Sequence, residues 1–406
     1  MSIRTDAGEL QPELVSLRRA LHRIPEIGLD LPRTQEAVLA ALDGLPLEVS
    51  TGTVLSSVTA VLRGGAPARE GGGSRQGPVV LLRGDMDALP VAEKSGEEFA
   101  STHAGAMHAC GHDLHTAGLV GAARLLSARR AELAGDVVFM FQPGEEGMDG
   151  AGHMIAEGVL DAAGRPIDAA YALHVVSYEY GKGVFTARPG PILAAADGMF
   201  VTVIGAGGHG ASPHGARDPI PAACEMVTAL QTMVTRGFDV FDPVVVTVGV
   251  FQAGTKRNVI PPEATFEATV RSFSPTARAS VRERAVRVCE GIAAAHGLEV
   301  EVRYSEEYPV TVNDAAEHDF LADTVREVFG ADRYAPMADP VTGSEDFSRV
   351  LERVPGAFVF LGACPTDDPA AAPPNHSPLA RFDDEVLGDG AALLAELAVR
   401  RLSRET

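Results

Sequence analysis

The sequence predicts an α/β protein in which a doubly wound domain carries a second, smaller domain as an insertion. Two observations support this fold class. Short apolar runs alternate with helical stretches in both end regions of the chain, and the order of elements changes from about residue 190. At 406 residues, the chain also exceeds what one hydrophobic core usually holds.

The first part of the chain shows the alternation of strands and helices that is typical of a doubly wound sheet. Leu14, Leu17 and Leu21 lie on one face of a helix that Pro25 stops, and Pro32 is placed to open a second helix. The run 79–82 is wholly apolar, which is typical of a strand buried on both faces. The expected elements are strands over 54–62, 79–82, 136–141 and 170–175, and helices over 116–131 and 151–159.

The middle of the chain predicts a separate β-α-β-β-α-β domain of ferredoxin-like type. Its expected strands cover 198–204, 244–251, 265–273 and 298–304, and its helices cover 219–235 and 276–296. The α/β order then returns with a helix over 315–329, a strand over 357–361 and a C-terminal helix. We therefore expect one domain from residues 1–189 and 308–406, and an inserted domain from residues 190–307.

Composition excludes several classes of partner. The 55 acidic residues outnumber 34 basic ones, and the net charge of -21 would repel nucleic acid and anionic membranes. No window approaches the length of an apolar membrane span, and no apolar signal segment is visible at the start. The four cysteines form no Cys-x-x-Cys pair, so we expect them to be reduced and the protein to be cytoplasmic.

A metal-binding motif stands at residues 107–113, which read Met-His-Ala-Cys-Gly-His-Asp. Cys110 and His112 are separated by one glycine, so an extended backbone can direct a thiolate and an imidazole to the same point. A lone cysteine is more often a small buried apolar residue. The neighbouring His112, Asp113 and His115 instead favour a transition-metal site.

Two consecutive carboxylates, Glu145 and Glu146, follow the expected strand 136–141. Neighbouring side chains diverge, so both cannot easily bind one metal ion. A division of labour is natural, in which one binds metal and the other deprotonates water held by the metal. An isolated Glu-Glu pair could also be a solvated turn. Its position after a buried strand, between Pro143 and Gly147, favours the functional interpretation.

Three further residues are candidates for the same site. His174 lies in an apolar strand, where a histidine is more often a hydrogen-bonded core residue, and His376 lies in a proline-rich loop, where a surface histidine is the usual case. Asp87 could accept a hydrogen bond that orients a ligand imidazole. Several candidates stand at strand ends, where ligands of α/β sheets bind, but spacing alone does not bring these segments together.

Eight ordered motifs resemble the di-metal amidohydrolases of the hippurate hydrolase type, which also include plant auxin-conjugate hydrolases. These enzymes are similar to the wider aminoacylase and glutamate carboxypeptidase superfamily. The motifs are 21–26 (Leu-His-Arg-Ile-Pro-Glu), 84–90 (Gly-Asp-Met-Asp-Ala-Leu-Pro), 107–113, 142–147 (Gln-Pro-Gly-Glu-Glu-Gly), 207–214 (Gly-Gly-His-Gly-Ala-Ser-Pro-His), 258–261 (Asn-Val-Ile-Pro), 343–347 (Gly-Ser-Glu-Asp-Phe) and 375–378 (Asn-His-Ser-Pro).

The resemblance implies roles for residues of this chain. Two divalent metal ions would be bound by five ligands, with Cys110 as the bridge: Cys110, His112, Glu146, His174 and His376. Glu145 would be the general base. The wider superfamily has histidine where this chain has Asp85 and aspartate where it has Cys110, so the resemblance does not make Asp85 a ligand.

The resemblance also assigns the inserted domain as a lid through which a homodimer forms. His209 would reach the site of a neighbouring subunit and stabilise the oxyanion, while Asn258 and Arg271 would hold the carboxylate of the substrate. A loop histidine, a turn asparagine and an exposed arginine are the alternatives. The implied activity is hydrolysis of small N-acyl amino acids, hippurate-like or N-acetylated. Zn, Mn, Co and Ni all suit the mixed ligands.

Other functions fit parts of the sequence. A metallo-carboxypeptidase or dipeptidase would use the same metal site, and an inactive relative would hold metal while binding a ligand. Residues 205–210 match the dinucleotide pattern Gly-x-Gly-x-x-Gly, but prolines follow where a helix should open. Cys110 beside His108 or His112 could be a nucleophile. No Gly-x-Ser-x-Gly elbow occurs.

Overall fold

The computed structural model describes residues 2–66 and 77–404. It divides into two compact units. Unit 1 comprises Met1–Ile192, Val312–Asp339 and Arg349–Thr406, and unit 2 comprises Leu193–Thr311 and Pro340–Ser348. None of the helices in the described part of the chain combines the length and apolar character needed to cross a bilayer.

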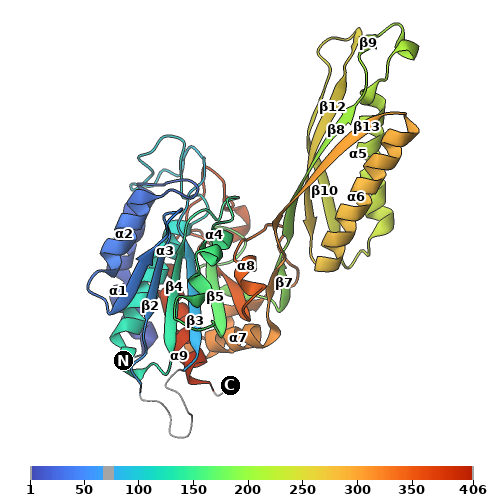
Figure 1. Ribbon diagram of the computed structural model, residues 1–406. Coiled ribbons are helices and arrows are strands. Elements are labelled where there is room, and N and C mark those ends of the chain that lie inside the picture. The colour runs from blue at the N-terminus through green and yellow to red at the C-terminus, as the bar shows by residue number, and fades with distance from the viewer. Residues whose placement is uncertain (1, 67–76, 405–406) are drawn as a thin grey trace. The chain divides into compact units, whose positions relative to one another are not determined.

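Unit 1 is built on one mixed sheet of eight strands in the order β1-β2-β4-β3-β5-β16-β6-β15 (Figure 1). The four central strands β4, β3, β5 and β16 are parallel, whereas β1 and β2 run antiparallel at one side. The strands are β1 (Leu47–Thr51), β2 (Val58–Leu62), β3 (Val79–Asp85), β4 (Asp136–Gln142), β5 (Ala169–Val176), β6 (Phe185–Ala187), β15 (Tyr334–Pro336) and β16 (Gly356–Gly362).

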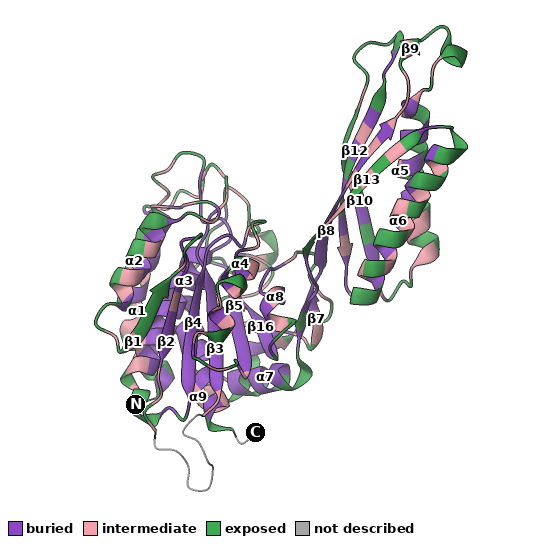
Figure 2. Ribbon diagram, viewed as in Figure 1, coloured by how far each residue is buried: buried purple, intermediate pink, exposed green. Residues whose placement is uncertain are grey.

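The central strands are buried along their length, as their apolar sequences predict. Every residue of β3, β4 and β16 is buried, and in β5 only His174 is partly exposed (Figure 2). The helices α1, α3 and α9 pack against one another, and α3 and α9 also contact β3 and β5. The helices of unit 1 are α1 (Ile3–His22), α2 (Pro32–Leu42), α3 (His112–Ala128), α4 (Gly150–Ala156), α7 (Ala315–Phe329), α8 (Ser348–Leu351) and α9 (Val386–Ser403).

Local sequence signals fix where these helices begin. The Ser2 side chain accepts a hydrogen bond from the Thr5 backbone at the start of α1, and Pro32 is the first residue of α2. At α7, the Asp314 carboxylate accepts hydrogen bonds from the backbone of Ala316 and Glu317. α3 has no such side chain and instead begins after Gly111, whose φ is +88°.

Unit 2 is a four-stranded antiparallel sheet in the order β10-β12-β8-β13, with two helices packed against it. Along the chain its elements read β8-α5-β10-β12-α6-β13. Their bounds are β8 (Ala195–Ile204), α5 (Pro219–Gly237), β10 (Val244–Ala253), β12 (Glu263–Ser272), α6 (Pro275–Ala295) and β13 (Glu299–Tyr308). Residues of both helices, such as Met226 and Val281, share one buried core with sheet residues such as Phe266.

Two small sheets complete the structure. β9 (Gly208–His209) pairs with β11 (Val259–Ile260) in unit 2, and β7 (Gly190–Leu193) pairs with β14 (Thr311–Asn313) where the chain passes between the units. Short 3-10 helices cover Arg130–Glu132, Val159–Asp161, Pro213–Gly215, Ala331–Arg333 and Pro369–Ala371.

Two features differ from what the sequence patterns indicate. β1 is absent from the expected elements because four of its five residues are exposed, so no apolar alternation marks it. Pro340–Ser348 cluster with unit 2, although sequence reasoning assigns them to the first domain. Backbone hydrogen bonds account for this placement, because the Ala194 amide donates to the carbonyl oxygens of Val341 and Gly343.

Candidate metal centre

Metal-ligating side chains from four segments of unit 1 converge at the carboxyl ends of its central strands. Three of the groups whose ligand atoms all lie within 4.8 Å of one another consist entirely of predicted ligands and the predicted base. They are Cys110 with His112 and His174, Cys110 with Glu146 and His376, and His112 with Glu145 and Glu146. All five predicted ligands and the predicted base therefore lie in one cluster, and the Cys110 sulfur belongs to two of the groups.

Gly111 allows Cys110 and His112 to reach this cluster together. Its φ of +88° is one that L-residues rarely adopt, and it starts α3 directly at His112. A side chain here would also collide with a neighbour, because a Cβ atom on Gly111 would lie 2.4 Å from Val175 Cγ2. The motif thus requires glycine for both conformation and space.

Backbone carbonyl groups orient two of the imidazoles. His112 Nδ1 lies 2.9 Å from the Asp87 carbonyl oxygen, and His174 Nδ1 lies 2.8 Å from that of Val175. Because a carbonyl oxygen only accepts, Nδ1 of each ring carries a proton, and Nε2 is the ring nitrogen left to bind a metal ion. Burial, followed by His115, holds the pKa of His174 well below its ordinary value, so this ring is a neutral imidazole.

His376 adopts a backbone conformation with a φ of +69°, which is unusual for a residue other than glycine. Its amide donates to the Ala109 carbonyl oxygen at 2.8 Å. Its Nε2 lies 3.2 Å from both Cys110 Sγ and Glu146 Oε1. The Cys110 thiol and then the Glu146 carboxylate raise the pKa of His376 to about 10. The left-handed backbone and the hydrogen bond to Ala109 thus place the ring beside the sulfur.

The turn that carries Glu145 and Glu146 is held by Asp87. The two carboxylate oxygens of Asp87 accept hydrogen bonds from the backbone amides of Glu145 and Glu146, each at 3.0 Å. Glu145 is buried, with a relative exposure of 7%. Asp87 therefore contacts both sides of the cluster, through its carbonyl oxygen toward His112 and through its carboxylate toward the glutamate turn.

Asp85 and His115 form a buried pair that sequence reasoning did not identify. Asp85 accepts from Arg83 Nη1 and from His115 Nδ1, each at 2.5 Å. His115 Nε2 accepts from the Val175 amide at 2.8 Å. Burial opposes ionisation of Asp85, but Arg83, helped by His112 and His115, holds its pKa well below the ordinary value. Both ring nitrogens of His115 are hydrogen-bonded, so the pair connects Asp85 to the Val175 backbone beside the cluster.

A second buried network lies beside Asp113. Its Oδ2 is 2.8 Å from His22 Nδ1 and 2.7 Å from Arg18 Nε, and His22 Nε2 is 3.1 Å from Glu93 Oε1. Although burial opposes protonation, Asp113 and Glu93 raise the pKa of His22 to about 9. Asp113 is engaged by these cations and is not a member of the ligand groups in the described part of the chain.

Three predicted residues belong to unit 2. His209 is exposed on β9, its Nδ1 accepts from the Ala211 amide at 3.0 Å, and the Gly210 amide donates to the Asn258 carbonyl oxygen at 2.9 Å. Arg271 stands near the other end of the sheet, because it pairs with Ala196 while Glu263 pairs with Ile204. Its guanidinium donates to Thr269 Oγ1 at 2.6 Å. The structure brings His209 and Asn258 together and places Arg271 apart from them.

The donor set fits transition-metal ions. It combines thiolate, imidazole and carboxylate groups, which Zn, Mn, Co and Ni accept in proteins. His112 Nε2 is buried and has no hydrogen-bond partner among residues 2–66 and 77–404. Since a buried nitrogen without a partner costs free energy, its position among anionic donors is explained by a bound cation.

Comparisons with known proteins identify the family. The sequence profile of Peptidase family M20/M25/M40 matches residues 81–400. The chain belongs to this family. It is 35% identical over 402 residues to "Thermostable carboxypeptidase 2" of Saccharolobus solfataricus, with 98% of each chain covered. It is 36% identical over 387 residues to "N-acetylcysteine deacetylase" of Bacillus subtilis, covering 95% of this chain and 96% of the relative.

The fold is also shared with a solved structure. The crystal structure of the Bacillus subtilis YXEP protein, described as a dinuclear metal binding peptidase from the M20 family, matches with a TM-score of 0.82. Its sequence identity is 33%, and the match covers 98% of this chain and 99% of that one. The family membership confirms the resemblance found in the sequence, and it confirms that the chain is a metal-dependent amidohydrolase.

Proposed function

We propose that this protein hydrolyses the amide bond of N-acyl amino acids, with two divalent metal ions bound at the cluster in unit 1. The observation that carries the proposal is the convergence of Cys110, His112, Glu146, His174 and His376. Cys110 groups with His112 and His174 and, separately, with Glu146 and His376, so it is the residue that would contribute to holding both ions. The deacetylase and the dinuclear peptidase among the relatives support this substrate class and this number of ions.

Glu145 is the general base of the proposed reaction. When bound, the two ions supply Lewis acidity that polarises the scissile carbonyl and makes a water molecule more acidic. Glu145 takes a proton from the attacking water and then gives it to the leaving nitrogen. Asp87 fixes the amides of Glu145 and Glu146, so that neighbouring carboxylates keep different directions. One serves as base and the other as ligand.

Unit 2 is proposed to act as a lid and to form a homodimer. His209 of a neighbouring subunit would donate to the developing oxyanion, a contribution on the order of 3 kcal/mol for one lost donor. Asn258 and Arg271 would bind the substrate carboxylate. Asn258 precedes β11, before β12 begins, whereas Arg271 lies near the far end of β12, about 26 Å along the strand from Glu263 at about 3.3 Å per residue. This separation favours a site to which two subunits contribute one residue each.

The edge strand β10 supports a dimer through unit 2. It is one end of the four-stranded sheet, and its side chains Val245, Val250 and Phe251 remain 42%, 38% and 41% exposed. An exposed apolar edge strand readily pairs with another chain. Sedimentation of the wild type and of Val250→Lys tests this: a dimer in the wild type and a shift toward monomer in the variant are expected. A wild-type monomer would overturn the dimer and, with it, the role of His209 in a second subunit.

A carboxypeptidase or dipeptidase is the second candidate, because one relative is named a thermostable carboxypeptidase. The test begins with elemental analysis of the protein. Metal-free protein is then reloaded with Zn, Mn, Co or Ni and offered N-acetyl and N-benzoyl amino acids beside short peptides with free amino ends. Two ions per chain and turnover of N-acyl amino acids are expected. Turnover of peptides alone favours the second candidate, and a fully loaded protein without turnover indicates an inactive metal-holding relative.

A further inference from the structure

The backbone hydrogen bonding between the parallel strands β3 and β5 ends before β5 reaches the cluster of candidate metal ligands. Parallel pairing runs from Val80 with Ala169 to Arg83 with Ala172, whereas β5 continues to Val176 beside β16. The Val176 carbonyl oxygen accepts from the Ala363 amide, which follows β16. Because successive residues of a strand direct their peptide groups to opposite sides, those of Val175 face the side where β3 no longer pairs.

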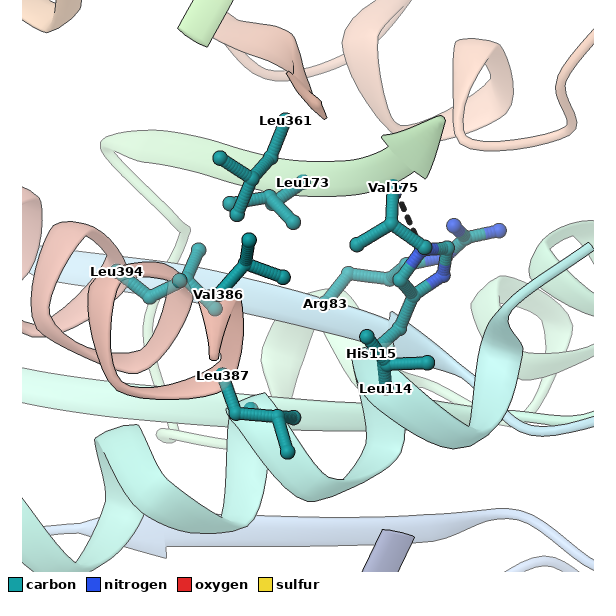
Figure 3. A pocket seen from close by; sticks show the side chains of 11 residues that line it. Arg83, Leu114, His115, Leu173, Val175, Leu361, Val386, Leu387 and Leu394 are labelled. Atoms are coloured by element: carbon teal, nitrogen blue, oxygen red, sulfur yellow. Dashed lines mark hydrogen bonds between the residues drawn. The ribbon is translucent and has the colours of Figure 1, made fainter. Parts of the chain in front are cut away.

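Two side chains form hydrogen bonds with the amide and carbonyl groups of Val175 that no neighbouring strand pairs. His115 Nε2 accepts from its amide at 2.8 Å, as the dashed line in Figure 3 shows. Asn375 Nδ2 donates to its carbonyl oxygen at 3.1 Å. The same oxygen lies 2.8 Å from His174 Nδ1 and so fixes the His174 ring. The backbone of Val175 is thus the point from which His174 is held.

Asn375 also binds the Cys110 segment and the chain beyond β5. Its Nδ2 lies 3.2 Å from the Cys110 carbonyl oxygen and 3.8 Å from Cys110 Sγ. Its Oδ1 accepts from both the amide and the hydroxyl of Ser177, each at 2.9 Å. One amide side chain therefore connects three segments that carry the candidate ligands Cys110, His174 and its own neighbour His376.

We propose that Asn375 is a positioning residue of the metal centre, which holds Cys110 and His174 close together, with Cys110 Sγ 3.4 Å from His174 Nε2. The proposal deepens the proposed function and depends on it. Asn375 ligates no ion. It acts by holding the two backbone segments that carry Cys110 and His174. Partners of this kind typically change metal affinity by about 10- to 100-fold when they are removed.

Asn313 offers a matched control in the same unit. Its side chain also bridges separate segments, donating to the carbonyl oxygens of Arg188 and Phe358 at 2.9 and 3.0 Å and accepting from the Phe358 amide at 2.7 Å. It belongs to none of the ligand groups in the described residues. If Asn375 were only a structural bridge, Asn375→Ala and Asn313→Ala should affect metal binding equally.

The experiment titrates metal-free protein with Co²⁺, followed by equilibrium dialysis and by the sulfur-to-cobalt charge-transfer absorption. The proteins are the wild type, Asn375→Ala, Asn375→Asp and Asn313→Ala. Aspartate keeps the volume and the acceptor toward Ser177 but loses both donors. We expect about 10- to 100-fold weaker binding and an altered absorption band in both Asn375 variants. Asn313→Ala should lower the thermal stability of the metal-free protein while it keeps the wild-type affinity and band.

Wild-type affinity and an unchanged band in folded Asn375 variants would overturn the positioning role and leave the proposed function standing. A wild type that binds no Co²⁺ would overturn both. If Asn375→Ala does not fold, Asn375→Asp carries the test. Ser177→Ala supplies a milder version, because it removes one hydrogen bond that holds the Asn375 side chain. Its affinity is expected between those of the wild type and Asn375→Asp, and an affinity equal to the wild type counts against the proposal.

Discussion

Adjacent residues of this site have different tasks because their surroundings differ. Glu145 and Glu146 share one turn and one anchor, Asp87. Glu146 lies 3.2 Å from His376 and is grouped with it and Cys110, whereas Glu145 shares a group with His112 and Glu146. Cys110 and Asn375 also differ in role, because Asn375 donates to the Cys110 carbonyl oxygen while only the Cys110 sulfur is a metal donor.

Glu145→Gln tests the division between base and ligand. The substitution keeps the shape of the side chain but removes its capacity to accept a proton. We expect turnover of N-acyl amino acids to fall at least about 100-fold, the lower range of general-base contributions, with metal content unchanged. Elemental analysis and steady-state rates measure the two quantities. The matching Glu146→Gln variant should instead lose metal, and high activity of metal-loaded Glu145→Gln would contradict the assignment.

Gly111→Ala tests the requirement for glycine between Cys110 and His112. A Cβ atom there would meet Val175 Cγ2 at 2.4 Å, in addition to the strain of a φ of +88°. Gly105→Ala is the control, because Gly105 has a φ of +80° but nothing lies within 4 Å of its added Cβ. The control should cost about 1–2 kcal/mol of unfolding free energy. Gly111→Ala should cost more and also weaken metal binding, and equal effects of the two substitutions would contradict the steric argument.

At this scale the sequence indicated the candidate donors and one support, Asp87, but not the other supports. Cys110, His112, Glu146, His174 and His376 were candidates because thiolate, imidazole and carboxylate groups are recognisable as residue types. Asn375 and the pair of Asp85 and His115 act through hydrogen bonds to Val175, a valine with no chemical signal of its own. Their roles depend on where the β3–β5 ladder stops, which periodicity does not report.

The elements that hold the site were predictable where their sequences are apolar. The helix expected over 315–329 is α7, and the strand expected over 136–141 is β4 with one added residue. α3 begins at His112, four residues earlier than expected, because Gly111 rather than a capping side chain starts it. β1 was missed because its side chains face solvent.

α3 and α9 leave a small cavity against the sheet, lined by Leu114, His115, Gly118, Leu173 and Leu394 among others (Figure 3). A Cβ atom on Gly118 would meet nothing within 4 Å. Gly118→Ala should therefore stabilise the protein by about 1 kcal/mol through helix propensity. On the same helix, Gly121→Ala should destabilise it, because its Cβ would lie 2.8 Å from Ala391 Cβ. Urea unfolding measures both, and a loss of stability in Gly118→Ala would contradict the cavity argument.

For the whole molecule, the buried network around His22 predicts a pH dependence of stability. The charged or titratable groups around the ring are Asp113, Glu93, Arg18 and His108. Asp113 and Glu93 raise its pKa from 6.5 to about 9, against burial and the charge of Arg18. The folded state therefore favours the protonated ring. Its stabilisation is complete below about pH 6.5 and is lost as the pH rises toward 9.

His22→Gln supplies the reference for this measurement. The difference in unfolding free energy between metal-free wild type and the variant should be constant below about pH 6.5 and shrink by about 3 kcal/mol up to pH 9, at 1.36 kcal/mol per pKa unit. Denaturant unfolding in the presence of a chelator keeps bound ions from contributing. A difference that does not change over this interval would show that His22 is not charged in the folded protein.

The sequence separation of the metal donors determines at which stage of folding a metal ion can bind. Cys110 and His376 stand 266 positions apart, with the whole β8–β13 segment between them. In an unfolded polypeptide, closing such a loop costs about 5 kcal/mol of entropy, which weakens metal binding relative to the folded chain, where the donors already lie together. We therefore expect the apoprotein to acquire its native topology first and the ions to bind the completed site. Refolding should proceed at the same rate with or without added metal. Unfolding should become slower once the metal ions are bound.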